Sequence, residues 1–163
     1  AKLRCWGQNA FGQLGLGDLA NRGDGPNEMG TSLPQPNLGT GRTAIAVYAG
    51  GLMTCAALDN GKVRCWGLND AGQLGIGDST SRGANPGEMG DLLPYLQLGT
   101  GNAAKTISIG DRHACAILQN DRVSCWGAND VGQGGFNDSS SGCGARPGST
   151  GDWCPYVELG VLK

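Results

Sequence analysis

Hydrophobic and polar residues alternate along two short stretches of the chain, residues 44–49 and 105–109. Alternation with a period of two is typical of a strand that buries one face. Each stretch is followed by two further apolar segments with a polar turn between them, at 54–58 and 62–66 in the first case. The pattern therefore predicts a half-buried strand followed by a β-hairpin, and it predicts this unit twice.

The motif Cys-Trp-Gly-x-Asn occurs three times, beginning at Cys5, Cys65 and Cys125, which are 60 residues apart. A fixed period of this length indicates a repeat architecture. With 31 glycines among 163 residues and turn residues beside each Trp, the chain is predicted to be all-β. We expect one continuous repeat domain: a partial repeat at 1–43 that lacks its first hairpin strand, a second repeat at 44–103, and a third at 104–163 with a divergent loop at 139–154.

The hairpin register follows from counting. If residues 59–61 form a three-residue loop, Cys55 lies directly opposite Cys65 at a non-hydrogen-bonded position, where Cα atoms are about 4.5 Å apart. A disulfide spans that distance. Such a loop needs a left-handed third residue, which is Gly61 here and Asp121 in the next repeat.

Seven cysteines change the picture of the compartment. Those that recur in step with a repeat predict a disulfide framework and an oxidising environment. The alternative is a set of buried free thiols in a cytosolic protein. Cys5 is the odd cysteine, predicted to be free or bonded outside this chain. The predicted pairs are Cys55 with Cys65, Cys115 with Cys125, and Cys143 with Cys154.

Charge and motif content argue against several functions. The net charge is −2 and no basic cluster occurs, which argues against nucleic-acid binding. No apolar run approaches the roughly 20 residues of a membrane helix. We find no paired nucleophile and base, no metal cluster and no phosphate-binding loop. The chain is therefore predicted to be non-catalytic, without catalytic or metal residues and without a cofactor.

Polar residues that recur in the repeats are assigned to structure. Asn9, Asn69 and Asn129 are expected to bond the backbone of their own turns. In the loops that follow, Arg22 with Glu28, and likewise Arg82 with Glu88, are expected to form exposed ion pairs that shape the loop.

The divergent third loop carries the candidate contact residue, because loops carry function more often than scaffolds do. Trp153 is the preferred contact residue, and the alternative is that it packs on the disulfide of its own loop. Asn137 begins the sequence Asn-Asp-Ser, a candidate site of N-glycosylation in a secreted chain.

The stretches 50–78 and 110–138, and in part 5–18, contain Cys-Ala-x-Leu, a turn, and Cys-Trp-Gly-x-Asn-x-x-Gly-Gln. This phrase resembles the repeat of the regulator of chromosome condensation family, in its secreted, disulfide-bearing branch. The resemblance implies a propeller of seven four-stranded blades and a structural position for His113. Gly134 stands where the pattern has Leu, and Asn137 where it has Gly, which calls tight packing of the third blade into question.

Three repeats do not close a seven-bladed ring, so we expect a segment of a longer protein or an assembly of several chains. The preferred function is a non-catalytic β-propeller module, extracellular or on the cell surface, that acts as a binding or structural scaffold. Its more specific form assembles through incomplete terminal blades into an oligomer or surface filament. The expected partner is a protein, or further copies or repeats of the same protein. The alternatives, drawn from the resemblance, are guanine nucleotide exchange on a small GTPase and inhibition of a secreted hydrolase.

Overall fold

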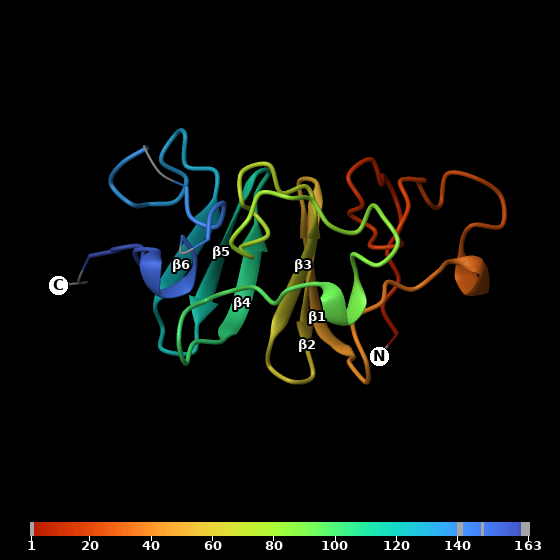
Figure 1. Cartoon of the computed structure of the whole chain (residues 1–163), viewed down its shortest axis with the longest axis horizontal. Coiled ribbons are helices and arrows are strands. Elements are labelled where there is room, and N and C mark those ends of the chain that lie inside the picture. The colour runs from red at the N-terminus through yellow and green to blue at the C-terminus, as the bar shows by residue number, and fades with distance from the viewer. Residues whose placement is uncertain (1, 140–141, 148, 161–163) are drawn as a thin grey trace.

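Two three-stranded antiparallel sheets stand side by side in the computed structural model, which describes residues 2–139, 142–147 and 149–160 (Figure 1). The fold is all-β, as predicted. Within the described residues, no helix has the length and apolar character needed to cross a membrane. The elements are β1 (Ala44–Gly50), β2 (Met53–Leu58) and β3 (Val63–Gly67) in the first sheet, β4 (Ala104–Ile109), β5 (His113–Leu118) and β6 (Val123–Gly127) in the second, and the 3-10 helices η1 (Gly30–Ser32), η2 (Gly90–Leu92) and η3 (Gly151–Trp153).

The repeats follow one another along the long axis of the molecule (Figure 1). The N-terminal segment lies at one end, the two sheets lie in the middle, and the loop of the third repeat lies at the other end. Half-buried and exposed residues alternate along β1, which confirms the pattern expected for this strand. Each sheet is therefore a blade that offers its faces to its neighbours, as stacked repeats do.

The turn between β2 and β3 is the predicted three-residue loop. The N–H of Leu58 donates to the carbonyl of Lys62 over 2.8 Å and closes the loop. Gly61 is left-handed with φ of 75°, and Asp121 takes the same conformation in the next repeat with φ of 65°. The counted register is confirmed, since Cys55 pairs with Cys65 across the two strands.

Disulfides lie within single hairpins or single loops. The two hairpin disulfides each join Cα atoms 4.0 Å apart, and the loop disulfide joins Cα atoms 5.8 Å apart. Each closes a short segment, so its entropic contribution is at most about 2–3 kcal/mol and its main effect is local rigidity. The pairs are Cys55–Cys65, Cys115–Cys125 and Cys143–Cys154.

The segment expected as the fourth strand of each blade forms no regular strand within the described residues and pairs with the third strand at isolated points, including a bridge between Ser124 and Tyr156. Leu96 N–H donates to Val63 O over 2.8 Å, and Val157 N–H donates to Val123 O over 2.9 Å. The expected four-stranded blade is thus replaced by three regular strands and a short edge segment. Pro94 begins the first of these segments, and its missing N–H explains why the ladder does not extend in that direction.

A buried indole joins each blade to the preceding repeat. Trp66 Nε1 donates to the carbonyl of Gln13 over 3.0 Å, and Trp126 Nε1 donates to that of Gln73 over 2.8 Å. Both indoles are almost completely buried, whereas the equivalent Trp6 is 62% exposed. The hydrogen bond satisfies the one polar atom of a large apolar ring, as a buried indole requires.

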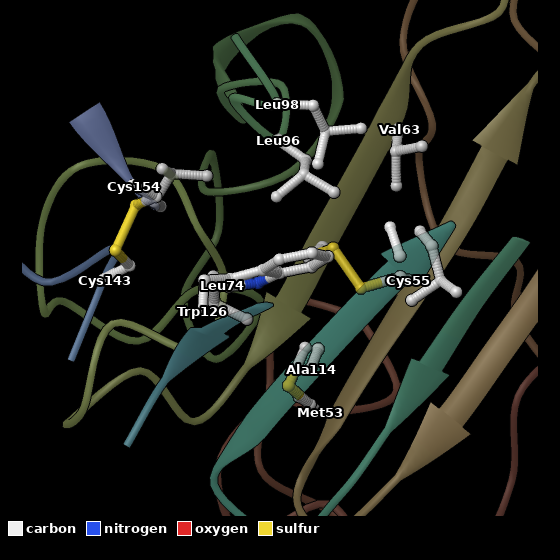
Figure 2. Close-up of a cluster of buried hydrophobic side chains, with 14 of the residues drawn as sticks. Met53, Cys55, Val63, Leu74, Leu96, Leu98, Ala114, Trp126, Cys143 and Cys154 are labelled. Atoms are coloured by element: carbon white, nitrogen blue, oxygen red, sulfur yellow. A yellow bond between two sulfur atoms is a disulfide. The ribbon is translucent and has the colours of Figure 1, made fainter. Parts of the chain in front are cut away.

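The core lies between the two blades. Figure 2 shows the indole of Trp126 beside Leu74 and close to the disulfide of Cys55, with Leu96 on the other side. Gly75 makes this contact possible, because a Cβ there would overlap Leu96 and press on the indole. Gly75 is also left-handed, with φ of 64°. One glycine therefore serves both the turn and the packing between repeats.

In the third repeat, which contains β4–β6, the ring of Phe136 fills the space that Gly134 leaves empty. A Cβ at Gly134 would overlap the ring of Phe136, which is half-buried and packs against the core. The ring therefore replaces the side chain that Leu74 supplies in the second repeat. Asn137, which stands where the second repeat has Gly77, takes the left-handed conformation with φ of 59°. The turn is preserved at a residue type that tolerates this conformation.

Replacing Trp126 by Ala should lower the free energy of unfolding by about 3–5 kcal/mol, because it empties the interface between blades and leaves the carbonyl of Gln73 without its donor. The matched control is Trp6→Ala, which removes the same ring from an exposed position and should cost less than about 1 kcal/mol. Urea unfolding followed by circular dichroism gives both values. Equal losses for the two variants would contradict the assigned role of the buried indole.

Candidate functional site

Trp153 is the last residue of η3, in the disulfide-bonded loop of the third repeat. Its side chain is 78% exposed, so it does not pack on the disulfide of its own loop. The neighbouring Cys154 is buried. The helix therefore presents the indole to solvent while the disulfide anchors the loop beneath it.

A groove of about 680 Å³ begins beside Trp153. Three segments far apart in the sequence form its walls: the turn before β3, the edge segment with the chain that follows it, and η3. Its walls contain both polar and apolar residues, so the groove offers hydrogen-bonding groups together with apolar contact surface. The walls comprise residues 61–63, 94–100, 102–103 and 150–153.

Asp152 fixes η3 to the rim of the groove. Its carboxylate accepts hydrogen bonds from the hydroxyl of Thr100 over 2.6 Å and from the backbone N–H of Thr100 over 3.0 Å. These bonds hold the pKa of Asp152 below its usual range, and the bond from the hydroxyl contributes more than the bond from the backbone N–H. The carboxylate therefore stays ionised at neutral pH and acts as a clamp for the loop.

The same clamp occurs one repeat earlier, where Asp91 accepts from the hydroxyl of Thr40 over 2.6 Å. The residue after the clamping aspartate is Leu92, which is 77% exposed, and in the third repeat it is Trp153. In the first repeat, the exposed Ser32 occupies this position. The backbone is thus shared, and the exposed side chain at its tip differs in each repeat.

Tyr95 supplies an aromatic wall to the groove. The Nζ of Lys62 lies 4.6 Å from the centre of the ring, and the guanidinium carbon of Arg64 lies 4.4 Å from it. Arg64 is buried and donates to the carbonyl of Leu38 over 2.6 Å. Cations over an aromatic face are attracted by its electron density, so they hold the ring in place.

The recurring asparagines bond the backbone of their own turns, as expected. Asn69 is fully buried and its Nδ2 donates to the carbonyls of Asp78 and Thr80 over 2.9 and 3.1 Å. Its Oδ1 accepts from the N–H of Leu74 over 2.9 Å. The side chain replaces backbone partners that the turn cannot supply, and its complete burial keeps it out of reach of a ligand.

The expected ion pairs between arginine and glutamate are wrong. Arg22 pairs with Asp18 over 2.6 Å, and Arg82 pairs with Asp78 over 2.7 Å. Glu88 instead accepts hydrogen bonds from backbone N–H groups, including that of Gly83 over 2.9 Å. Opposite charges close in the sequence suggested a pair, whereas converging backbone donors satisfy the carboxylate better.

Cys5 has no disulfide partner in this chain and is half-buried. Burial raises the pKa of its thiol to about 11. The thiolate is the nucleophile in disulfide chemistry, so this cysteine reacts slowly at neutral pH while the surrounding structure is intact. The prediction that it bonds to another chain stays a prediction.

Two further candidates lie on the third repeat. Asn137 and Ser139 of the predicted glycosylation sequence are both exposed. Glycosylation itself stays a prediction. His113 is half-buried at the start of β5, and its ring occupies the space over Gly110, where a Cβ would overlap it. Across the described ranges, no group of three His, Cys, Asp or Glu residues is placed to hold a metal ion.

The chain is similar to known proteins along most of its length. The model of the Regulator of chromosome condensation (RCC1) repeat matches residues 3–57 and 60–117, and a second model of this repeat matches 44–73 and 104–133. The probable E3 ubiquitin-protein ligase HERC4 of Homo sapiens is 32% identical over 140 residues, which are 86% of this chain and 12% of the relative. The ultraviolet-B receptor UVR8 of Arabidopsis thaliana is 32% identical over 135 residues, which are 82% of this chain and 27% of the relative.

The guanine nucleotide exchange factor SRM1 of Saccharomyces cerevisiae is 28% identical over 152 residues, with 80% of this chain and 31% of the relative covered. Among solved structures, Prp20p from Saccharomyces cerevisiae superimposes with a TM-score of 0.63 at 20% identity, over 94% of this chain and 33% of that one. That similarity shows the fold. The chain spans less than a third of the length of each of these relatives.

Cys5 should be the one thiol that alkylates without prior reduction, and intact mass should show three disulfides in the untreated chain. With a pKa of about 11, only about one thiol in ten thousand is ionised at pH 7. The alkylation rate should therefore rise about tenfold per pH unit from pH 7 to 10. The urea-unfolded chain is the control, where the rate should level off near pH 9, as for an ordinary thiol. The same levelling-off in the folded chain would contradict the burial of Cys5.

Proposed function

Because the chain belongs to the Regulator of chromosome condensation (RCC1) repeat family, we propose that it is a non-catalytic β-propeller scaffold that binds a protein partner outside the cell or at its surface. The repeats supply rigidity, and the loop of the third repeat supplies the contact. The observation that carries the proposal is the exposed Trp153 at the rim of the groove, on a loop that a disulfide and the Asp152 clamp both hold.

An exposed tryptophan on a fixed loop suits protein binding. Trp is enriched among the few residues that dominate binding energy, because it buries a large rigid surface at low entropic cost. The clamp to Thr100 and the disulfide at Cys154 order the loop before a partner arrives. An ordered loop loses less conformational entropy on binding, which favours affinity.

The extracellular setting is supported by the cystines. Three disulfides in 163 residues are typical of chains that fold in an oxidising compartment, because cytosolic thiols are kept reduced. Two of them recur at the same position of successive repeats, so they are part of the repeat plan. This argument concerns the compartment and is independent of the identity of the partner.

Assembly with further repeats is supported by Trp6. The equivalent Trp66 and Trp126 are buried because the preceding repeat covers them and offers a glutamine carbonyl to the indole. A further repeat placed before Trp6 would cover its exposed ring in the same way. We propose that this surface packs against such a repeat, either in the same polypeptide or in another copy.

Guanine nucleotide exchange is the second candidate, favoured by the similarity to SRM1, an exchange factor. The solved neighbour Prp20p binds Gsp1p and histones. The chain spans only 31% of SRM1, and fold similarity is a weak warrant for activity. The cystines favour a different compartment from that of a nucleotide-dependent regulator.

Trp153→Ala should weaken peptide binding without destabilising the chain. Peptides selected from a displayed random library on the wild-type chain should lose about 30-fold in affinity for the variant, the loss expected of a dominant contact. The matched control is Leu92→Ala, which removes an equally exposed side chain from the equivalent position of the second repeat. Equal affinities for wild type and Trp153→Ala would remove the proposed contact.

The exchange activity has a direct assay. Release of a fluorescent GDP analogue from a panel of purified small GTPases should not accelerate when the chain is added, whereas an exchange factor such as SRM1, used as positive control with the GTPase that it acts on, should accelerate it. The measurement is the rate of fluorescence decay with excess unlabelled nucleotide. Acceleration by this chain would replace the extracellular scaffold with the exchange factor as the preferred function.

A further inference from the structure

Two of the three long loops bind a carboxylate of their own. The backbone N–H groups of residues 83–85 all donate to Oε2 of Glu88, over 2.9, 3.0 and 3.0 Å. Those of residues 23–25 donate in the same way to Oε2 of Glu28, over 2.8, 3.1 and 2.9 Å. Successive N–H groups that converge on one point, beginning at a left-handed residue, form an anion-binding nest. In both loops that residue is a glycine, with φ of 97° at Gly83 and 91° at Gly23.

The nest of the second repeat favours the charged form of its carboxylate. Partial burial acts to raise the pKa of Glu88, but hydrogen bonds from the side chain of Asn85 and from the three backbone N–H groups outweigh it, so the pKa lies below the ordinary value. This local geometry thus stabilises an anion rather than a neutral group.

The third repeat has the backbone of the nest but no carboxylate. Gly144 follows Gly83 by 61 positions, and Ser149 follows Glu88 by the same interval. Gly144 is left-handed with φ of 105°. It packs on the carbonyl of Gly72, just as Gly83 packs on that of Gly12. The two loops therefore share their geometry at the glycine where the nest begins.

Ser149 fills the nest only in part. Its Oγ accepts from the N–H of Arg146 over 2.9 Å, and its backbone carbonyl accepts from the N–H of Gly144. The N–H of Ala145, the middle donor of the nest, has no acceptor among the residues that the structure describes. One donor is thus open, and the other two are held by neutral oxygens.

The surroundings carry positive charge at the right place. Arg146 stands where the second repeat has Asn85, is exposed, and forms no ion pair within the described part of the chain. It lines a hollow of about 450 Å³ together with Ala145, Ser149, Arg112 and Asp130.

The other charged side chains of this hollow already form bonds of their own. Arg112 pairs with Asp70 over 2.9 Å, and the carboxylate of Asp130 accepts from Gln133 over 2.6 Å. Arg146 is therefore the cation that remains for an incoming anion, and a guanidinium suits a carboxylate because it offers parallel N–H donors.

We propose that the nest at residues 144–146 binds a carboxylate from outside the loop, supplied by an acidic side chain of a protein partner. The carboxylate takes the place that Glu88 occupies in the second repeat: it accepts from Ala145 N–H, displaces the hydroxyl of Ser149 at Arg146 N–H, and pairs with the guanidinium of Arg146. The site does not involve Trp153, and none of the residues that line its hollow also lines the groove beside Trp153.

The test is an amide NMR titration of the full chain with the blocked peptide acetyl-Gly-Glu-Gly-amide. The amide of Ala145 should move in a saturable manner, and the amides of residues 83–85 should not, because their nest is already filled. The Gln counterpart of the peptide should bind at least about tenfold more weakly. Absence of a saturable shift at Ala145, or equal binding of the Gln peptide, would overturn the proposal. Acetate binding as tightly as the Glu peptide would overturn the assignment to a protein side chain and leave a site for free carboxylates.

Refilling the nest from within provides the matched variant. Ser149→Glu installs the residue of the second repeat, so it should raise the melting temperature and abolish the shift of the Ala145 amide by the Glu peptide. Ser149→Gln has the same length without the charge and should retain peptide binding more than Ser149→Glu does. If Ser149→Glu binds the Glu peptide as wild type does, the nest is not the site.

Discussion

The hydrogen bond from a buried indole to a glutamine carbonyl of the preceding repeat sets the relation between neighbouring blades. It occurs at Trp66 with Gln13 and at Trp126 with Gln73, over 3.0 and 2.8 Å. A bond between one donor and one acceptor inside a packed core allows little change of distance or angle. The same contact therefore places the N-terminal repeat against the first sheet and the first sheet against the second, and the repeats follow one another along the long axis (Figure 1).

The two proposed contact sites lie where equivalent positions of the repeats differ. The clamp between an aspartate and a threonine is the same in two loops, whereas the exposed residue beside it changes from Leu92 to Trp153. The nest is likewise shared, whereas its carboxylate at Glu88 is replaced by Ser149. Because the two loops share the clamp and the left-handed glycine where the nest begins, the loop of the second repeat serves as a control for each side-chain difference in the third. Both differences fall on the loop of the third repeat, which is also the loop with its own disulfide.

The sequence was sufficient for the local geometry of the hairpins. Strand periodicity and opposed cysteines allow only one register, so the pairing of Cys55 with Cys65 followed from counting. The partner of Glu88 was not accessible in this way, because backbone donors leave no trace in side-chain identity. The divergent sequence of the third loop indicated Trp153 as a contact residue. The groove beside Trp153 could not be predicted, because folding brings together the edge segment and the turn before β3 that form its walls. The sequence also offered no sign that the fourth strand is reduced, except for Pro94 at the start of the edge segment.

Each cystine lies within a single hairpin or loop, with its two halves ten or eleven residues apart. Partners so close along the chain meet soon after synthesis, so oxidative folding has little opportunity to mispair cysteines of different repeats. This arrangement affects how the number of repeats can change during evolution. A genetic duplication or deletion of one whole repeat carries a complete cross-link with it and leaves no orphaned thiol in its neighbours. The number of blades can therefore change without any rearrangement of the covalent framework.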